Sequence, residues 1–199
     1  TASRTVFANP AVRLLQLNVA KFDAIKHHAQ SLVADAKVGL QQLSQGLTGW
    51  QSPSAWLQQG QGGIAEWNAY YEQVTVAEIT TPTRTGLPSD AQVLGAVKRT
   101  GQASDIVVCA AGGLPGELHK LWRTDQPNGY HLEYGFSCMG YEIAGGLGVK
   151  MAKPEREVIV VVGDGSYLML NSELATSVML GYKIILVVLD NRGYGCINR

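Results

Sequence analysis

Two oxygen-bearing side chains follow two apolar runs of the sequence, and their types suit a metal ion beside a phosphate group. Asp164 follows the run at residues 158–162, inside a Gly-Asp-Gly-Ser turn, and Asn191 follows the run at residues 184–189. Mg²⁺ prefers hard oxygen ligands and often combines one or two protein oxygens with phosphate oxygens and water. Glycines beside Asp164 would let backbone amides approach phosphate closely. The sequence therefore indicates a metal–diphosphate site.

The elements around these residues must bring them together. Both apolar runs lack alternation, which is typical of parallel strands covered on both faces. Apolar residues recur at helical spacing over 167–182, where we expect one helix that Gly181 ends. Because ligands bind outside the carboxyl ends of parallel strands, Asp164 and Asn191, which are 27 residues apart, should lie side by side.

The turn, the 27-residue spacing and the glycine two residues after Asn191 are similar to the cofactor motif of thiamine-diphosphate enzymes. The resemblance implies thiamine diphosphate and Mg²⁺ as cofactors. The implied metal ligands are Asp164, Asn191 and the Gly193 carbonyl, and the implied diphosphate contacts are Gly163, Gly165 and Ser166.

Two upstream stretches extend the resemblance. Residues 137–148 resemble the family's Gly-x-Met-Gly stretch, which implies Met139 as the apolar wedge that bends the cofactor. The Ser137 carbonyl and the Met139 amide would bond the pyrimidine ring, and Ser137 stands where many relatives have Gly. Residues 105–115 resemble a strand and glycine loop of the family, so the amides of Gly112 and Gly113 are expected to reach the cofactor.

Residues 129–142 and 188–195 are similar to one branch of this family, which opens a cyclic 1,2-diketone by hydrolytic C–C cleavage in myo-inositol catabolism. This implies a hydrolase with a small cyclic diketone as substrate, in a homo-oligomer. The family's activating glutamate lies on a separate domain, so we expect no catalytic residue in this chain and no turnover by it alone. Acetolactate synthase-like enzymes, 2-oxo acid decarboxylases and a non-catalytic cofactor domain remain alternatives.

Simpler interpretations explain each motif taken singly. A strand followed by Gly-Asp-Gly is compatible with an ordinary tight turn, and only the coincidence of three stretches favours a cofactor site. A dinucleotide fingerprint fails because Tyr167 and Leu168 stand where a third small residue is needed. The four histidines lack zinc-ligand spacing, although His131 and Glu133 precede the cofactor stretch closely enough to reach a substrate.

The composition of the chain narrows the class of protein further. The chain has 16 basic and 16 acidic residues and no basic cluster, which disfavours nucleic acid and anionic membranes as partners. No run of about eighteen apolar residues could span a bilayer. Three cysteines without a CxxC pair favour a reduced, cytoplasmic setting.

We expect an α/β fold whose mostly parallel sheet has helices on both faces, preceded by the end of a second α/β domain. Residues 1–45 would form the C-terminal end of that domain, and residues 46–84 would connect it to the next. Residues 85–199 would form an incomplete diphosphate-binding domain. The expected elements are strands at 12–19 and 35–40, a helix at 20–33, an irregular stretch at 46–63 and a helix at 64–79. The chain lacks an initiator Met and ends eight residues after Asn191, as expected of a fragment.

Overall fold

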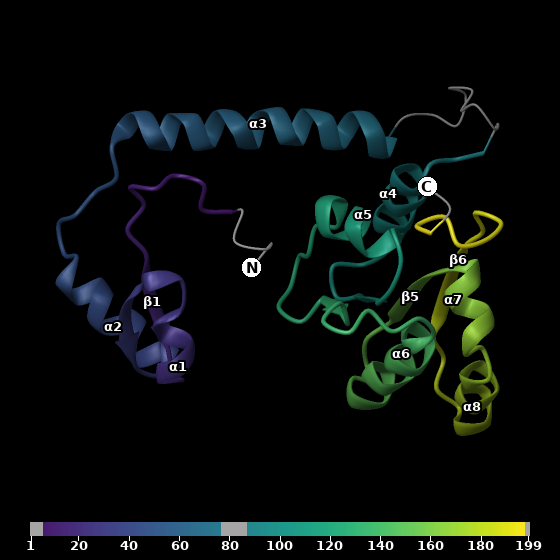
Figure 1. The fold of residues 1–199 in the computed structure, drawn as a ribbon. Helices are drawn as coiled ribbons and strands as arrows, with labels where there is room; N and C mark the ends of the chain where they lie inside the picture. The colour runs from purple at the N-terminus through teal and green to yellow at the C-terminus, as the bar shows by residue number, and fades with distance from the viewer. Residues whose placement is uncertain (1–5, 77–86, 198–199) are drawn as a thin grey trace. The chain divides into compact units, whose positions relative to one another are not determined.

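The computed structural model describes residues 6–76 and 87–197 (Figure 1). Contacts divide the chain into two compact units, Thr1–Gly60 and Gln61–Arg199. The domain boundary expected near residues 80–88 falls largely on residues 77–86, outside the described part of the chain.

The first unit is built on two parallel strands, β1 (Leu15–Asn18) and β2 (Gln30–Val33), which pair from Leu15 with Gln30 to Asn18 with Val33. Between them lie the short helix α1 (Lys21–Ala24) and the 3₁₀ turn η2 (Lys26–His28). The helix predicted over 20–33 is therefore wrong in its second half. His27 and His28, beyond the end of α1, have positive φ angles of 61° and 55°, which depart from helical geometry and turn the chain into β2.

The strand predicted over 35–40 is also wrong, because helix α2 (Ala36–Gly46) begins there. Asp35 caps this helix by accepting a hydrogen bond of 3.1 Å from the Val38 amide. A side chain of this kind at the N-cap satisfies an amide that the first helical turn leaves unpaired.

Helix α3 (Ser54–Val76) begins inside the stretch that the sequence suggested was irregular. The helix predicted over 64–79 is confirmed as far as Val76, where the described part ends. In the second unit, the Tyr71 ring lies 3.7 Å from the Arg123 guanidinium carbon, and Arg99 donates to the Thr75 carbonyl at 2.8 Å. These contacts fasten the end of α3 to the helices beside it.

The second unit contains a four-stranded, all-parallel sheet in the order β4–β3–β5–β6. Its strands are β3 (Ile106–Cys109), β4 (Tyr130–Leu132), β5 (Val158–Gly163) and β6 (Ile185–Leu189). Gly163 pairs with Leu189, so Asp164 and Asn191 both follow the carboxyl ends of neighbouring strands. The predicted crossover between the two apolar runs is confirmed.

Helices cover both faces of this sheet (Figure 1). On one face, α4 (Asp90–Thr100) and α5 (Leu114–Leu121) pack Leu94 and Leu118 against Val107 and Val161. On the other face, α6 (Tyr141–Ala152) and the helices that follow β5 pack against the alternate strand residues, which include Val108 and Val160. The predicted fold class, α/β with a parallel sheet between helices, is confirmed.

The single helix predicted over 167–182 is two helices, α7 (Asp164–Met169) and α8 (Glu173–Leu180). Leu170, with φ −148°, breaks the helix between them. Gly181 ends α8 in the left-handed conformation, with φ 72°, as its position predicted. Across residues 6–76 and 87–197, no helix combines the length and apolar character that crossing a membrane requires.

Candidate cofactor site

A cavity of about 270 Å³ lies at the carboxyl ends of β3, β5 and β6. All ten residues that the sequence marked as cofactor or metal contacts line it, together with neighbours such as Ala111 and Tyr194. These ten are Gly112, Gly113, Ser137, Met139, Gly163, Asp164, Gly165, Ser166, Asn191 and Gly193. Segments far apart in the sequence thus converge on one hollow, at the position where open parallel sheets bind ligands.

Asp164 has one carboxylate oxygen in use and one without a partner. Its Oδ2 accepts a hydrogen bond of 2.8 Å from the Gly193 amide. Its Oδ1 is buried and has no hydrogen-bond partner among the described residues. A buried carboxylate oxygen without a partner is unfavourable, and a cation is the group that compensates it best. The site therefore fits the Mg²⁺ that the sequence motif implies.

The other two predicted metal ligands stand on the turn after β6. Asn191 is exposed and lines the cavity, and Gly193 has φ 141°, a conformation that L side chains rarely adopt. No group of three or more His, Cys, Asp or Glu residues that could hold a metal occurs within residues 6–76 and 87–197. The predicted metal ligands do not form such a group, because only Asp164 is a carboxylate. The other two donors are the amide oxygen of Asn191 and the carbonyl oxygen of Gly193.

Gly165 is closely covered from two directions. A Cβ atom at this position would lie 2.7 Å from Tyr194 Cε1 and 3.6 Å from Met139 Cε. The absence of a side chain therefore allows Tyr194 and Met139 to approach the first turn of α7.

The loop before α6 is held by a carboxylate. Glu133 accepts hydrogen bonds from the amides of Phe136 at 2.8 Å and Cys138 at 3.1 Å. These bonds lower the pKa of the Glu133 carboxyl below its ordinary value, and the bond from Phe136 has the largest effect. Ser137, between the two donors, has φ 53°.

Two backbone groups of this loop belong to residues that line the cavity, namely the Ser137 carbonyl and the Met139 amide. They are the two groups that the resemblance assigned to the pyrimidine ring. The amides of their neighbours Cys138, Gly140 and Tyr141 are engaged within the protein.

Sequence reasoning missed Glu142, the fully buried carboxylate behind the cavity. It accepts hydrogen bonds from the Ala111 amide at 3.0 Å, the Gly140 amide at 3.1 Å and the Ser166 hydroxyl at 2.7 Å. The signal in the sequence is a charged residue among the apolar and glycine residues of 141–149. Such a residue is expected to be buried only when its charge is hydrogen-bonded.

His131 and Cys109 are structural residues that do not line the cavity. His131 Nε2 lies 2.9 Å from the Tyr141 hydroxyl, and neither His131 nor Glu133 lines the cavity. Burial, and then the nearby charge of Glu142, raise the pKa of the Cys109 thiol to about 12. Cys109 is therefore a protonated core residue and is unsuited to act as a nucleophile.

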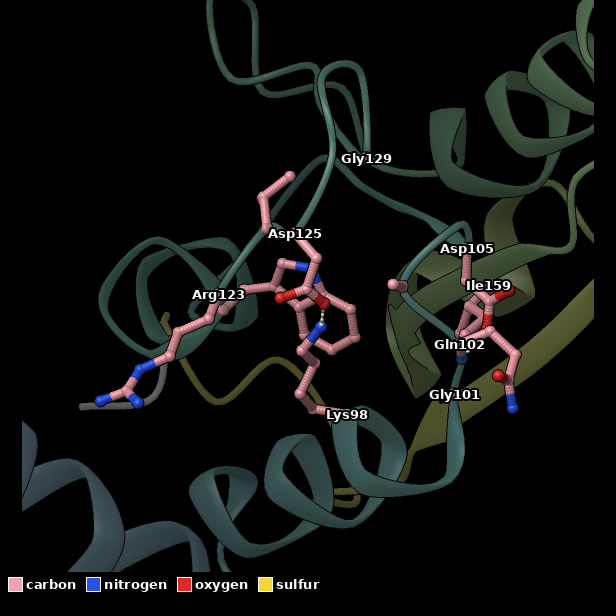
Figure 2. A pocket seen from close by; sticks show the side chains of 11 residues that line it. Lys98, Gly101, Gln102, Asp105, Arg123, Asp125, Gly129 and Ile159 are labelled. Atoms are coloured by element: carbon pink, nitrogen blue, oxygen red, sulfur yellow. Dashed lines mark hydrogen bonds and ion pairs between the residues drawn. The ribbon is translucent and has the colours of Figure 1, made fainter.

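A second, much smaller hollow lies at the amino ends of β3 and β5, beside Asp105 and Ile159 (Figure 2). Its volume is only about 10 Å³. Lys98 and Asp125 point toward one another and form an ion pair there, and the Lys98 ammonium lies 5.7 Å from the centre of the Trp122 ring. This cluster is satisfied within itself, whereas the carboxyl-end cavity is lined by all ten residues that the sequence marked.

Comparison with known proteins agrees with this geometry. Residues 110–199 match the sequence family described as "Thiamine pyrophosphate enzyme, C-terminal TPP binding domain". This part of the chain is thus similar to the C-terminal thiamine-diphosphate-binding domain of thiamine pyrophosphate enzymes.

The whole chain is similar to curated proteins named 3D-(3,5/4)-trihydroxycyclohexane-1,2-dione hydrolase. It is 40% identical to that of Bacillus licheniformis, 39% to that of Bacillus subtilis and 38% to that of Halalkalibacterium halodurans. Each alignment covers 100% of this chain and 34% of the relative. The chain therefore spans about a third of the length of these relatives.

Proposed function

We propose that this chain supplies the diphosphate-binding part of a thiamine diphosphate- and Mg²⁺-dependent hydrolase. The whole enzyme opens the ring of trihydroxycyclohexane-1,2-dione by C–C cleavage, as a cytoplasmic homo-oligomer of myo-inositol catabolism. The observation that carries the cofactor half of this proposal is the unpartnered, buried Oδ1 of Asp164 in a cavity lined by all ten predicted residues. The names of the relatives support the substrate half.

The roles of the residues follow from their chemistry. Asp164, Asn191 and the Gly193 carbonyl supply the hard oxygens that Mg²⁺ prefers. The backbone amides of Gly165 and Ser166 lie in the same turn, where they can donate to diphosphate oxygens. Met139 contributes an apolar surface to the cavity, beside the Ser137 carbonyl and the Met139 amide.

Thiamine diphosphate, when bound, supplies the electron sink that C–C cleavage beside a carbonyl requires. This chain contributes binding and orientation. The carboxylates among the described cavity residues are Asp164, proposed here as a metal ligand, and the α4 residue Asp90, and neither is the glutamate that the family uses. The activating glutamate is therefore assigned to another domain, and we expect the isolated chain to have no turnover.

The experiment for the substrate half uses the whole enzyme, loaded with thiamine diphosphate and Mg²⁺. Trihydroxycyclohexane-1,2-dione and pyruvate are offered in parallel, and ring opening, carbon dioxide and acetolactate are measured. Ring opening without carbon dioxide is expected. Carbon dioxide or acetolactate from pyruvate would instead identify a decarboxylase or an acetolactate synthase-like enzyme, and no product from either would indicate a non-catalytic protein.

A further inference from the structure

One buried carboxylate joins three of the segments that form the candidate cofactor cavity. Glu142 Oε1 accepts from the Ala111 amide, and Glu142 Oε2 accepts from the Gly140 amide and the Ser166 hydroxyl. Ala111 precedes the glycine loop after β3, Gly140 follows Met139, and Ser166 lies in the first turn of α7. A single side chain of α6 therefore contacts three of the segments that line or adjoin the cavity.

Because Glu142 is buried, its oxygens depend on these hydrogen bonds in place of water. Its side chain is fully buried, beside the core residues Ile143 and Cys109, and it has no ion-pair partner among the described residues. A buried carboxylate without a cation is tolerated only where several donors satisfy its oxygens. All of its donors here come from cavity segments, so displacement of any one segment would leave buried charge unsatisfied.

The Ser166 hydroxyl is committed to the same network. Its Oγ accepts a hydrogen bond of 2.7 Å from the Gly140 amide and donates one of 2.7 Å to Glu142. The hydroxyl proton is therefore engaged behind the cavity, and Ser166 can offer a diphosphate only its backbone amide. Gly140 itself requires its glycine, with φ 93° and a Cβ position 2.9 Å from Leu170 Cβ.

We infer that Glu142 is a positioning residue of the cofactor site: it holds the 111–113, 139–140 and 164–166 segments at the spacing that a diphosphate requires. It does not line the cavity, so it acts only through these segments. The inference rests on the proposed function for the identity of the ligand. The hydrogen-bond network itself can be tested without any cofactor.

The test compares Glu142→Gln with Glu155→Gln, a matched change at an exposed position. Glutamine preserves the shape of the side chain but places an NH₂ group where a carboxylate oxygen accepted. Amide hydrogen exchange of the unliganded chain should show protection lost at Ala111 or Gly140, whichever faces the new NH₂ group, by about tenfold or more, in Glu142→Gln only. Unchanged protection at both amides would overturn the inference.

Calorimetric titration with thiamine diphosphate and Mg²⁺ gives the second readout. We expect Glu142→Gln to weaken binding by about tenfold. Leu118→Ala, a core change on the opposite face of the sheet, separates positioning from general stability: it should lower the melting temperature and leave the dissociation constant unchanged. If both variants weaken binding in proportion to lost stability, Glu142 has only a structural role and the inference fails.

Two further outcomes separate the test of Glu142 from the test of the proposed function and from a failure to fold. If the wild-type chain does not bind the cofactor, the proposed function fails for this chain, and hydrogen exchange alone decides the role of Glu142. If Glu142→Gln does not fold, Glu142→Asp replaces it, because this variant retains the charge but shortens the reach. In Glu142→Asp, the Gly140 amide, two residues away in sequence, should keep more of its protection from hydrogen exchange than the Ala111 amide. Wild-type protection at Ala111 would contradict the inference.

Discussion

The Gly193 amide donates a hydrogen bond of 2.8 Å to Asp164 Oδ2, and so joins the turn after β6 to the turn after β5. This bond occupies one carboxylate oxygen and leaves Oδ1 buried and unpartnered among the described residues. Asp164, which lines the cavity, thus organises the turn that carries two of the proposed metal ligands, and it keeps one carboxylate oxygen without a partner.

The close cover of Gly165 leads to a prediction about the cofactor. In Gly165→Ala, the new methyl group would lie 2.7 Å from Tyr194 Cε1, so Tyr194 or the α7 turn must move. We expect thiamine diphosphate binding to weaken by about tenfold or more, since a shift of this kind displaces the amides that face the diphosphate. Calorimetric titration measures the dissociation constant. Binding at wild-type strength would contradict the prediction and show that the turn accommodates the methyl group.

Two glycines of α6 provide a stability test with an internal control. A Cβ at Gly146 would lie 2.2 Å from Val160 Cγ2, whereas a Cβ at Gly148 meets nothing within 4 Å. Gly146→Ala should therefore destabilise the chain by about 1–3 kcal/mol through overpacking. Gly148→Ala should stabilise it by about 0.5–1 kcal/mol, because alanine favours the helix. Urea unfolding measures both values, and equal effects of the same sign would contradict the packing described here.

The loop before α6 should respond to acid. Because the folded-state pKa of Glu133 is lowered, its hydrogen bonds to the Phe136 and Cys138 amides contribute stability above the unfolded pKa. That contribution is lost as the pH falls through the folded pKa, which lies below the model-compound value of 4.5. The amide proton shift of Phe136 should titrate with that midpoint by NMR and should lose this step in Glu133→Gln. A midpoint above 4.5 would show that the bonds are not made in solution.

Thiol reactivity should separate the three cysteines. Cys109 is buried and its pKa is raised to about 12, whereas Cys138 and Cys196 are exposed. In the native chain at pH 8, iodoacetamide should label Cys138 and Cys196 and spare Cys109, and denaturant should remove this protection. Mass spectrometry identifies the labelled sites, and rapid native labelling of Cys109 would mean that the core around β3 opens.

The second unit was largely predictable because its strands are short, apolar and followed by chemically distinctive turns. The runs at β5 and β6 and the glycine at position 181 were sufficient to place two parallel strands and a helical crossover. The gathering of the predicted site residues follows from the same rule, since parallel strands present their carboxyl ends at one edge. Whether these residues bind the cofactor is still a prediction.

The errors arose where tertiary context overrides local pattern. No local pattern predicted the positive φ angles of His27 and His28, or the gain from pairing β2 with β1, so a helix was extended through a strand. The break at Leu170 likewise carries no glycine or proline signal. Glu142 was overlooked because its three donors are distant in the sequence or belong to the backbone, and a pattern of side chains does not show backbone donors.

The most direct test of the cofactor site is a calorimetric titration of the chain with thiamine diphosphate, in Mg²⁺ and then in excess chelator. Asp164→Asn is compared with Asp125→Asn, which changes the distant Lys98 pair. We predict binding that requires Mg²⁺, is lost in Asp164→Asn and survives in Asp125→Asn. Binding that ignores the chelator and the Asp164 change, or no binding by the folded wild-type chain, would contradict Asp164 as the ligand of a metal–diphosphate site.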